Sequence, residues 1–249
     1  MEYKHNHSHQ KSALIYTTLI LGGCTLLLFY LFLFFGAFSL INFGMNYVQA
    51  LAFDSFLCFL FFIQHSTLIR KSIRAKIEQR IGAEYFGPFY TISSGFILLL
   101  MILLWQKTFV IASAGRLASW ALRALFVLCV LGFYWGVKSL GSFDPFGLEK
   151  VKFAVVKKEI KPDILIIKGP YLWVRHPLYF FSLLMIWSFP DLTADRLLFD
   201  LLWTVWIIIA TKLEERDLLI DFGEKYQQYK ARVPMLIPYR LKSRIDRIS

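Results

Sequence analysis

The apolar residues of this sequence come in long, nearly uninterrupted blocks, and the polar residues are gathered between them. A soluble domain of this length would interrupt its apolar residues with helical or strand periodicity. A bilayer core needs about 20 apolar residues in a helix, which the longer blocks supply. Backbone groups in lipid must be paired within their own segment, and the blocks are too long for barrel strands. The sequence therefore predicts an all-α fold, a polytopic transmembrane helical bundle.

Five to six membrane segments are expected in a single integral membrane domain that covers residues 1–249. The last two are short and form a helical hairpin around a turn at residues 190–193. After Glu214, apolar residues recur at helical spacing among charges, which predicts an amphipathic C-terminal helix. The expected segments are Ala13–Phe35, Val48–Leu68, Phe89–Trp105, Ala118–Val137, Leu178–Phe189 and Leu197–Leu213.

The net charge of +11 lies mostly in alternate loops and in the tail. Basic residues crowd residues 70–80, 150–175 and 225–247, whereas the intervening loops hold few. By the positive-inside rule both termini are cytoplasmic, and the charge is explained by membrane orientation and contact with the lipid bilayer, not by nucleic acid. The plan favours a bacterial inner membrane. No metal site is expected, because the three cysteines fall inside apolar blocks without CxxC spacing.

One candidate site is the run Gly169-Pro170-Tyr171-Leu172-Trp173-Val174-Arg175-His176-Pro177-Leu178-Tyr179. Pro177 suits the first position of a helix, so Arg175 and His176 are expected at a helix N-terminus at the membrane surface. A cation and an imidazole beside free backbone N–H groups form a pocket for a carboxylate or another anion. The alternative is that Arg175 reaches lipid headgroups and His176 fills the interface.

A second candidate is the acidic cluster that begins with Glu214 and Glu215, directly after a membrane segment. Such a cluster binds an ammonium group or sugar hydroxyls, or it is a solvated first turn of a helix. Tyr226 and Tyr229 share a helical face downstream, where their rings either cover a ligand or belong to an interfacial aromatic belt.

Three polar residues inside the second segment form a third candidate group. Asp54 is costly at membrane depth, so it is expected to face a partner or a cavity. Gln64 and His65 lie near the cytoplasmic end of the same segment. His65 is either a base or a hydrogen-bonding group between helices.

Taken together, the RHPLY run, the later Glu214-Glu215 pair, Phe222, the two tyrosines and Val233-Pro234 resemble the isoprenylcysteine carboxyl methyltransferase superfamily. Over roughly residues 48 to 240 the chain is most similar to the bacterial methanethiol S-methyltransferases, through Phe62–Ser66, Tyr90–Ser94, the FDPFGL segment at Phe143–Leu148 and Tyr229–Pro238. The proline in FDPFGL and the loop from Glu149 to Ile167 depart from the family pattern.

This resemblance implies S-adenosyl-L-methionine as methyl donor, bound by a region at about residues 165–240. The cofactor-binding residues would be Gly169, Pro170, Tyr171, Val174, Arg175, His176, Tyr179, Glu214, Glu215, Tyr226 and Tyr229. Arg175 or His176 would meet the cofactor carboxylate, and Glu214 or Glu215 its amino group or ribose.

The expected reaction is methyl transfer to a small thiol such as methanethiol, which yields dimethyl sulfide. His65, Arg175 and Glu214 are the candidate catalytic residues, with His65 assisting deprotonation of the thiol, and Asp54, Gln64 and His65 are the candidate substrate contacts. The alternatives are a lipidic acceptor (a prenylcysteine carboxylate or a phospholipid amine) and a non-catalytic membrane protein of the same fold.

Overall fold

The computed structural model describes residues 2–141, 144–151 and 164–239. Contacts divide the chain into two compact units, one formed by Met1–Phe109 with Asp144–Pro162 and the other by Val110–Phe143 with Asp163–Ser249. Each unit is described below by itself. The expected single membrane domain stays a prediction.

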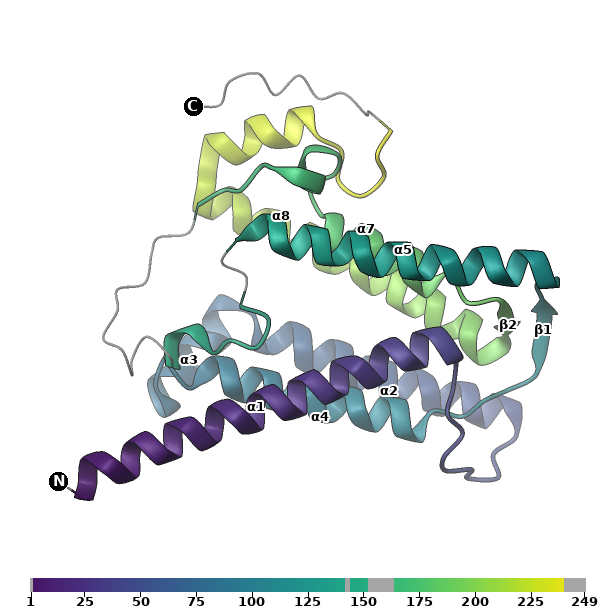
Figure 1. Cartoon of the computed structure of the whole chain (residues 1–249), viewed down its shortest axis with the longest axis horizontal. Coiled ribbons are helices and arrows are strands. Elements are labelled where there is room, and N and C mark those ends of the chain that lie inside the picture. The colour runs from purple at the N-terminus through teal and green to yellow at the C-terminus, as the bar shows by residue number, and fades with distance from the viewer. Residues whose placement is uncertain (1, 142–143, 152–163, 240–249) are drawn as a thin grey trace. The chain divides into compact units, whose positions relative to one another are not determined.

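Among its described residues, the first unit includes the helices α1 (Glu2–Phe35), α2 (Tyr47–Leu68), α3 (Lys71–Ile81) and α4 (Phe86–Leu104) (Figure 1). Helix α2 begins at a capping box in which the Asn46 side chain accepts from the Gln49 backbone N–H at 3.0 Å and the Gln49 side chain accepts from the Asn46 N–H at 3.1 Å. Helix α4 packs against both α1 and α2. Helix α3 lies in the basic loop, where the sequence had not predicted a helix.

The FDPFGL segment is anchored on α4, over the part of it that the structure describes. The Thr91 hydroxyl donates to the Phe146 carbonyl at 2.9 Å, and Leu148 is fully buried. A side chain at Gly87 would place its Cβ only 2.0 Å from the Gly147 carbonyl oxygen, and Gly147 itself has a φ of +64°. The two glycines therefore permit a backbone contact that no larger residue could make.

The second unit contains β1 (Val110–Ser113), α5 (Arg116–Leu140), the 3₁₀ helix η1 (Gly169–Leu172), α7 (Pro177–Ile186), β2 (Asp191–Thr193) and α8 (Ala194–Arg232). Helix α7 packs closely on α5, because a Cβ at Gly132 would lie 2.4 Å from the ring of Phe181 and one at Gly136 would lie 2.7 Å from Leu178. Small residues serve this purpose in membrane helix packing.

The turn of the short hairpin is a strand, which the sequence had not predicted. β2 pairs antiparallel with β1, so that Val110 faces Thr193 and Ser113 faces Asp191. The Thr193 side chain then caps α8 by accepting from the Arg196 N–H at 3.2 Å. Helix α8 continues through the expected last membrane segment into the expected amphipathic helix, with a kink at Gly223, where φ is +54°.

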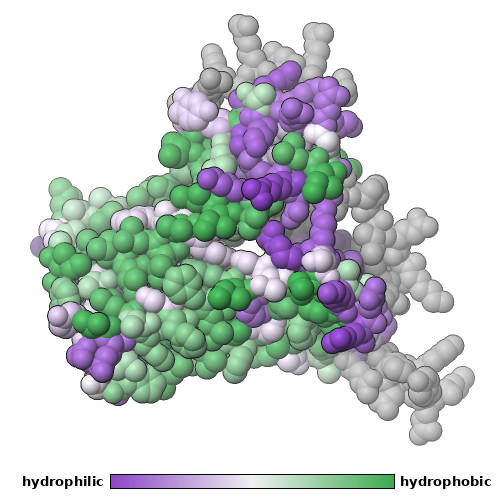
Figure 2. All heavy atoms as spheres, turned by 180° about the vertical axis from the view of Figure 1, so that it is seen from behind, coloured by the Kyte–Doolittle hydropathy of each residue, from purple (hydrophilic) through white to green (hydrophobic). Residues whose placement is uncertain are grey.

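Four helices of the described residues are long and apolar enough to cross a membrane: Lys11–Phe35, Tyr47–Leu68, Phe86–Leu104 and Arg116–Leu140. Each overlaps one of the four long segments predicted from the sequence, and the ends agree within three residues. Much of the visible surface is hydrophobic, as lipid-facing helices require (Figure 2). The all-α membrane bundle is therefore confirmed, whereas five or six full spans stays a prediction, since α7 has only 10 residues.

Candidate active site

The turn before α7 is built around a glycine that no other residue could replace without strain. Gly169 has a φ of +61°, and a Cβ on it would lie 2.3 Å from the Ser139 Oγ of α5. Residues 169–172 then form η1, which brings Tyr171 into the buried interior. Pro177 occupies the first turn of α7, as the sequence predicted.

The chain after α8 returns to this turn and pairs with it through the backbone. The Arg175 N–H donates to the Pro234 carbonyl at 2.9 Å, and the His176 N–H donates to the Met235 carbonyl at 3.2 Å. The Tyr229 hydroxyl donates to the Tyr171 carbonyl at 2.6 Å. Backbone hydrogen bonds therefore join the GPY/RHP turn to the segment that follows α8, and the Tyr229 hydroxyl joins it to α8 itself.

Arg175 is buried, and its guanidinium is engaged within the protein. Nε donates to Glu215 Oε1 at 2.7 Å, and one Nη lies 2.5 Å from the same oxygen. The other Nη donates to the carbonyls of Lys230 and Val233, at 3.0 Å in the first case. The Arg175 side chain therefore does not extend to lipid headgroups. Its donors link the turn before α7 to α8 and to the C-terminal segment.

Glu215 is the common partner of three cations or potential cations. Besides Arg175, it meets Lys230 Nζ at 3.0 Å and lies 3.4 Å from His176 Nε2. Burial alone would raise the pKa of Glu215, but the groups of His176, Lys230 and Arg175 together hold that pKa well below its usual range. Glu215 is therefore an ionised, buried carboxylate and not part of a solvated turn.

Glu214, in contrast, keeps its side chain 44% exposed. Its Oε2 lies 3.9 Å from His176 Nδ1, so the imidazole stands between the two adjacent carboxylates. The ring of His176 also stacks on that of Tyr179, with 5.8 Å between centroids. One acid of the pair is thus used inside the protein, and the other is available to a ligand.

A cavity of about 630 Å³ opens beside these groups. Volumes of this order are typical of cofactor and small-molecule sites. The residues lining it are Phe133, Leu140, Ile164, Leu165, Ile166, Tyr171, Arg175, His176, Pro177, Leu178, Tyr179, Ser182, Glu214, Leu218, Asp221, Phe222, Tyr226 and Tyr229. It therefore has a polar end, with carboxylates and an imidazole, and a wall of apolar and aromatic side chains.

Three tyrosines of the cavity are buried phenols. Burial raises the pKa of Tyr171, Tyr226 and Tyr229 above the ordinary value, so their hydroxyls stay protonated. Tyr226 and Tyr229 lie on one face of α8, with 6.0 Å between ring centroids, and both are almost fully buried. They are therefore part of a packed wall and not of an exposed aromatic belt.

The predicted cofactor residues divide into two groups. Those that line the cavity are Tyr171, Arg175, His176, Tyr179, Glu214, Tyr226 and Tyr229. Gly169, Pro170 and Val174 shape the turn, and Glu215 holds the ionic network, but these four are not among the lining residues. Asp221 also lines the cavity and was not predicted, although its position seven residues after Glu214 puts it on the same face of α8.

The three predicted substrate residues lie in the first unit. Asp54 is buried and accepts from the Gln106 backbone N–H at 3.0 Å. The Gln64 amide nitrogen lies 3.1 Å from the Ser93 hydroxyl, and His65 Nε2 lies 2.8 Å from the Tyr90 hydroxyl. These residues therefore bond between α2 and its neighbours, and their part in catalysis stays a prediction.

Comparison with known proteins places this arrangement in context. The model of the NnrU protein family matches residues 55–228. A methanethiol S-methyltransferase of Pseudomonas sp. is 36% identical over 79% of this chain and 76% of its own length, and one of Pseudomonas deceptionensis is 34% identical over 78% and 75%. Nurim of Mus musculus is 29% identical over 69% of each chain. No solved structure matches. The chain is a member of the NnrU protein family, within the methyltransferase superfamily that its sequence resembles.

Proposed function

We propose that this protein is an integral membrane methyltransferase that moves a methyl group from S-adenosyl-L-methionine to methanethiol or a similarly small thiol. Relatives that carry the name methanethiol S-methyltransferase, and that align over most of both chains, are the observation that carries the proposal. The cavity beside His176 and Glu214 supports it, because its polar end offers groups for both charges of a zwitterion.

The residues of the cavity fit the proposed cofactor. The methionyl end of S-adenosyl-L-methionine carries one carboxylate and one ammonium group. Glu214 is the exposed carboxylate of the pair and suits the ammonium. The N-cap residue His176 makes no side-chain capping hydrogen bond to α7, and Pro177, Leu178 and Tyr179 line the cavity, so this helix end together with His176 suits the carboxylate.

Arg175 and Glu215 take a different role in this proposal. Arg175 and Glu215 form an ion pair with one another. Arg175 also donates to the Lys230 carbonyl, and Glu215 also pairs with the Lys230 ammonium group. We therefore assign them to positioning of the turn that carries His176, and not to direct contact with the cofactor carboxylate or amino group.

The bound cofactor supplies a methyl group on a positively charged sulfur. When bound, it would transfer this methyl group to the thiolate of the acceptor, so that methanethiol and S-adenosyl-L-methionine would give dimethyl sulfide, S-adenosylhomocysteine and one proton released to water. The chain holds the two reactants in line and excludes water with the tyrosines and the apolar wall.

Binding and turnover of the purified protein test this proposal. S-adenosylhomocysteine should bind in calorimetry, and Glu214→Gln should weaken binding about tenfold, the equivalent of about 1.4 kcal/mol. Glu224→Gln is the matched control, because it removes the same charge from the exposed surface of α8 away from the cavity-lining residues. Dimethyl sulfide should appear in the headspace when methanethiol and the methyl donor are added.

The outcomes separate the acceptors. Product from methanethiol but not from a prenylcysteine or phosphatidylethanolamine supports the thiol. Methylation of a lipidic acceptor alone would keep the enzyme class and overturn the substrate. Absence of cofactor binding at millimolar concentration would contradict a methyltransferase function with any acceptor.

We also propose that both termini face the cytoplasm of a bacterial inner membrane. The basic stretches 70–80, 150–175 and 225–247 support this orientation, and 150–175 extends into the turn that carries Arg175. Single cysteines in the 141–167 loop should be labelled by a membrane-impermeant reagent only after the membrane is opened. Labelling in intact cells would reverse the orientation.

A further inference from the structure

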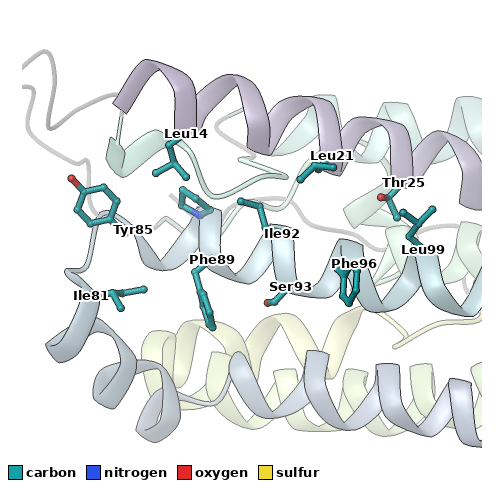
Figure 3. A pocket seen from close by; sticks show the side chains of 11 residues that line it. Leu14, Leu21, Thr25, Ile81, Tyr85, Phe89, Ile92, Ser93, Phe96 and Leu99 are labelled. Atoms are coloured by element: carbon teal, nitrogen blue, oxygen red, sulfur yellow. The ribbon is translucent and has the colours of Figure 1, made fainter. Parts of the chain in front are cut away.

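The first unit contains a second cavity, whose lining includes none of the predicted cofactor residues. It has a volume of about 500 Å³ and lies between α1 and α4, with Ile81 of α3 at one end (Figure 3). Leu14 and Leu21 contribute from α1, and Phe89 and Phe96 contribute from α4. The side chains that surround it are almost all apolar, so it suits a hydrocarbon and not a hydrated solute.

The cavity runs along the helices for about the thickness of one lipid leaflet. Leu14 lies at the end formed by Ile81 and Tyr85, whereas Thr25 approaches Gly95 further along α4. Helices α1 and α4 therefore run in the same direction. Thr25 follows Leu14 by 11 positions, which is about 16.5 Å of helix at 1.5 Å per step, close to half of a hydrocarbon core of about 30 Å.

Three basic residues lie close in the sequence to residues that line the Ile81 end of the cavity. Lys76 and Arg80 of α3 are exposed, and Arg80 directly precedes Ile81. Lys11 lies three residues before Leu14, which places both on one face of α1. Two acids belong to this region: Glu78 lies 2.9 Å from Arg74 and 3.6 Å from Lys150, and Glu84 directly precedes Tyr85. The three basic residues Lys76, Arg80 and Lys11 therefore outnumber Glu84.

We propose that this groove holds one acyl chain of an anionic phospholipid from the cytoplasmic leaflet, with the lipid phosphate at Arg80, Lys76 and Lys11. The apolar walls between α1 and α4 take the chain, and the basic end of α3 takes the headgroup. Clusters of lysine and arginine beside membrane helices recognise anionic lipids in this way.

Native mass spectrometry of the detergent-purified full chain tests this inference with two probes that share the same acyl chains, phosphatidylglycerol and phosphatidylcholine. One phosphatidylglycerol should bind per chain, at least fivefold more tightly than phosphatidylcholine. Arg80→Gln should weaken it about fivefold, the effect of one basic residue at a membrane surface. Lys107→Gln is the matched control, because this exposed lysine follows α4 at its opposite end.

A second pair of variants tests the groove itself. Leu21→Trp fills the cavity from α1 and should abolish the tight site, whereas Leu27→Trp adds the same bulk at an exposed position that does not line the cavity. Equal binding of the two lipids, or equal effects of the two tryptophans, would overturn the proposal. So would a dimer that Leu21→Trp disrupts, since a second copy of the chain would then cover this face.

Discussion

Removal of the Glu215 carboxylate is the sharpest test of how the site is held together. Glu215→Ala removes the carboxylate that pairs with the buried Arg175 and with Lys230. The two side chains of the Arg175–Glu215 pair are only 7% and 6% exposed, so the charge left on Arg175 would be poorly solvated. Removing one member of such a pair costs about 3–5 kcal/mol.

That cost should be visible as a large shift in thermal stability. For domains of this size each kcal/mol lowers the unfolding midpoint by about 2–4 °C, so Glu215→Ala should lower the apparent midpoint by roughly 6–20 °C. Intrinsic tryptophan fluorescence of the purified protein during heating is the assay. Glu214→Ala is the control, because it removes the neighbouring, half-exposed carboxylate and should cost less than about 1 kcal/mol.

A paired substitution separates the loss of charge balance from simple loss of packing. Arg175→Met combined with Glu215→Leu removes both charges, and it should recover part of the stability that Glu215→Ala loses. If Glu215→Ala unfolds within about 3 °C of Glu214→Ala, the buried ionic network does not support the site. A double variant that is less stable than the single variant would likewise refute the charge argument.

Three further predictions follow from the same features. The folded-state pKa of Glu215 lies below its ordinary value of 4.5, so the stabilisation by this carboxylate is complete above pH 4.5 and is lost as the pH falls toward the folded-state pKa. The difference in melting midpoint between wild type and Glu215→Gln should therefore stay constant from neutral pH to about pH 5 and shrink in more acidic buffer. Gly169→Ala should destabilise the protein by about 1–3 kcal/mol in a thermal melt, because of its positive φ and the nearby Ser139, whereas Gly23→Ala, with open space around it, should not. His65→Ala should slow dimethyl sulfide formation and remove a step from its pH–rate profile, and an unchanged profile would exclude His65 as the base.

Much of the fold could be predicted because lipid imposes a simple length rule. Each of the four long apolar blocks lies in a helix, and the membrane-length spans of these helices end within three residues of the prediction, although α1 itself begins earlier, at Glu2. Helix α3 was missed, although Ile73, Ile77 and Ile81 recur at helical spacing, because its many charges were read only as an orientation signal. The β1–β2 pair has strands of four and three residues, too short for periodicity to show.

The sequence identified several residues of the candidate site, but it did not show which of them contact one another. Arg175 and Glu215 were both named, yet nothing in a linear sequence shows which of the two adjacent acids will be buried against the arginine. That choice depends on the rotation of α8 about its own axis. The backbone pairing of residues 175–176 with 234–235 is likewise long-range and leaves no local pattern.

The pairing of the GPY/RHP turn with Pro234 and Met235 also sets the order in which the site can be made during synthesis. Domains assemble from the N-terminus as the ribosome delivers the chain. Arg175 emerges long before Glu215, Lys230 and Val233, so its charge must stay hydrated or in contact with lipid headgroups until the last stretch arrives. A nascent chain is therefore inserted in the membrane well before it can hold a ligand, and a chain stopped before Val233 would never complete the site.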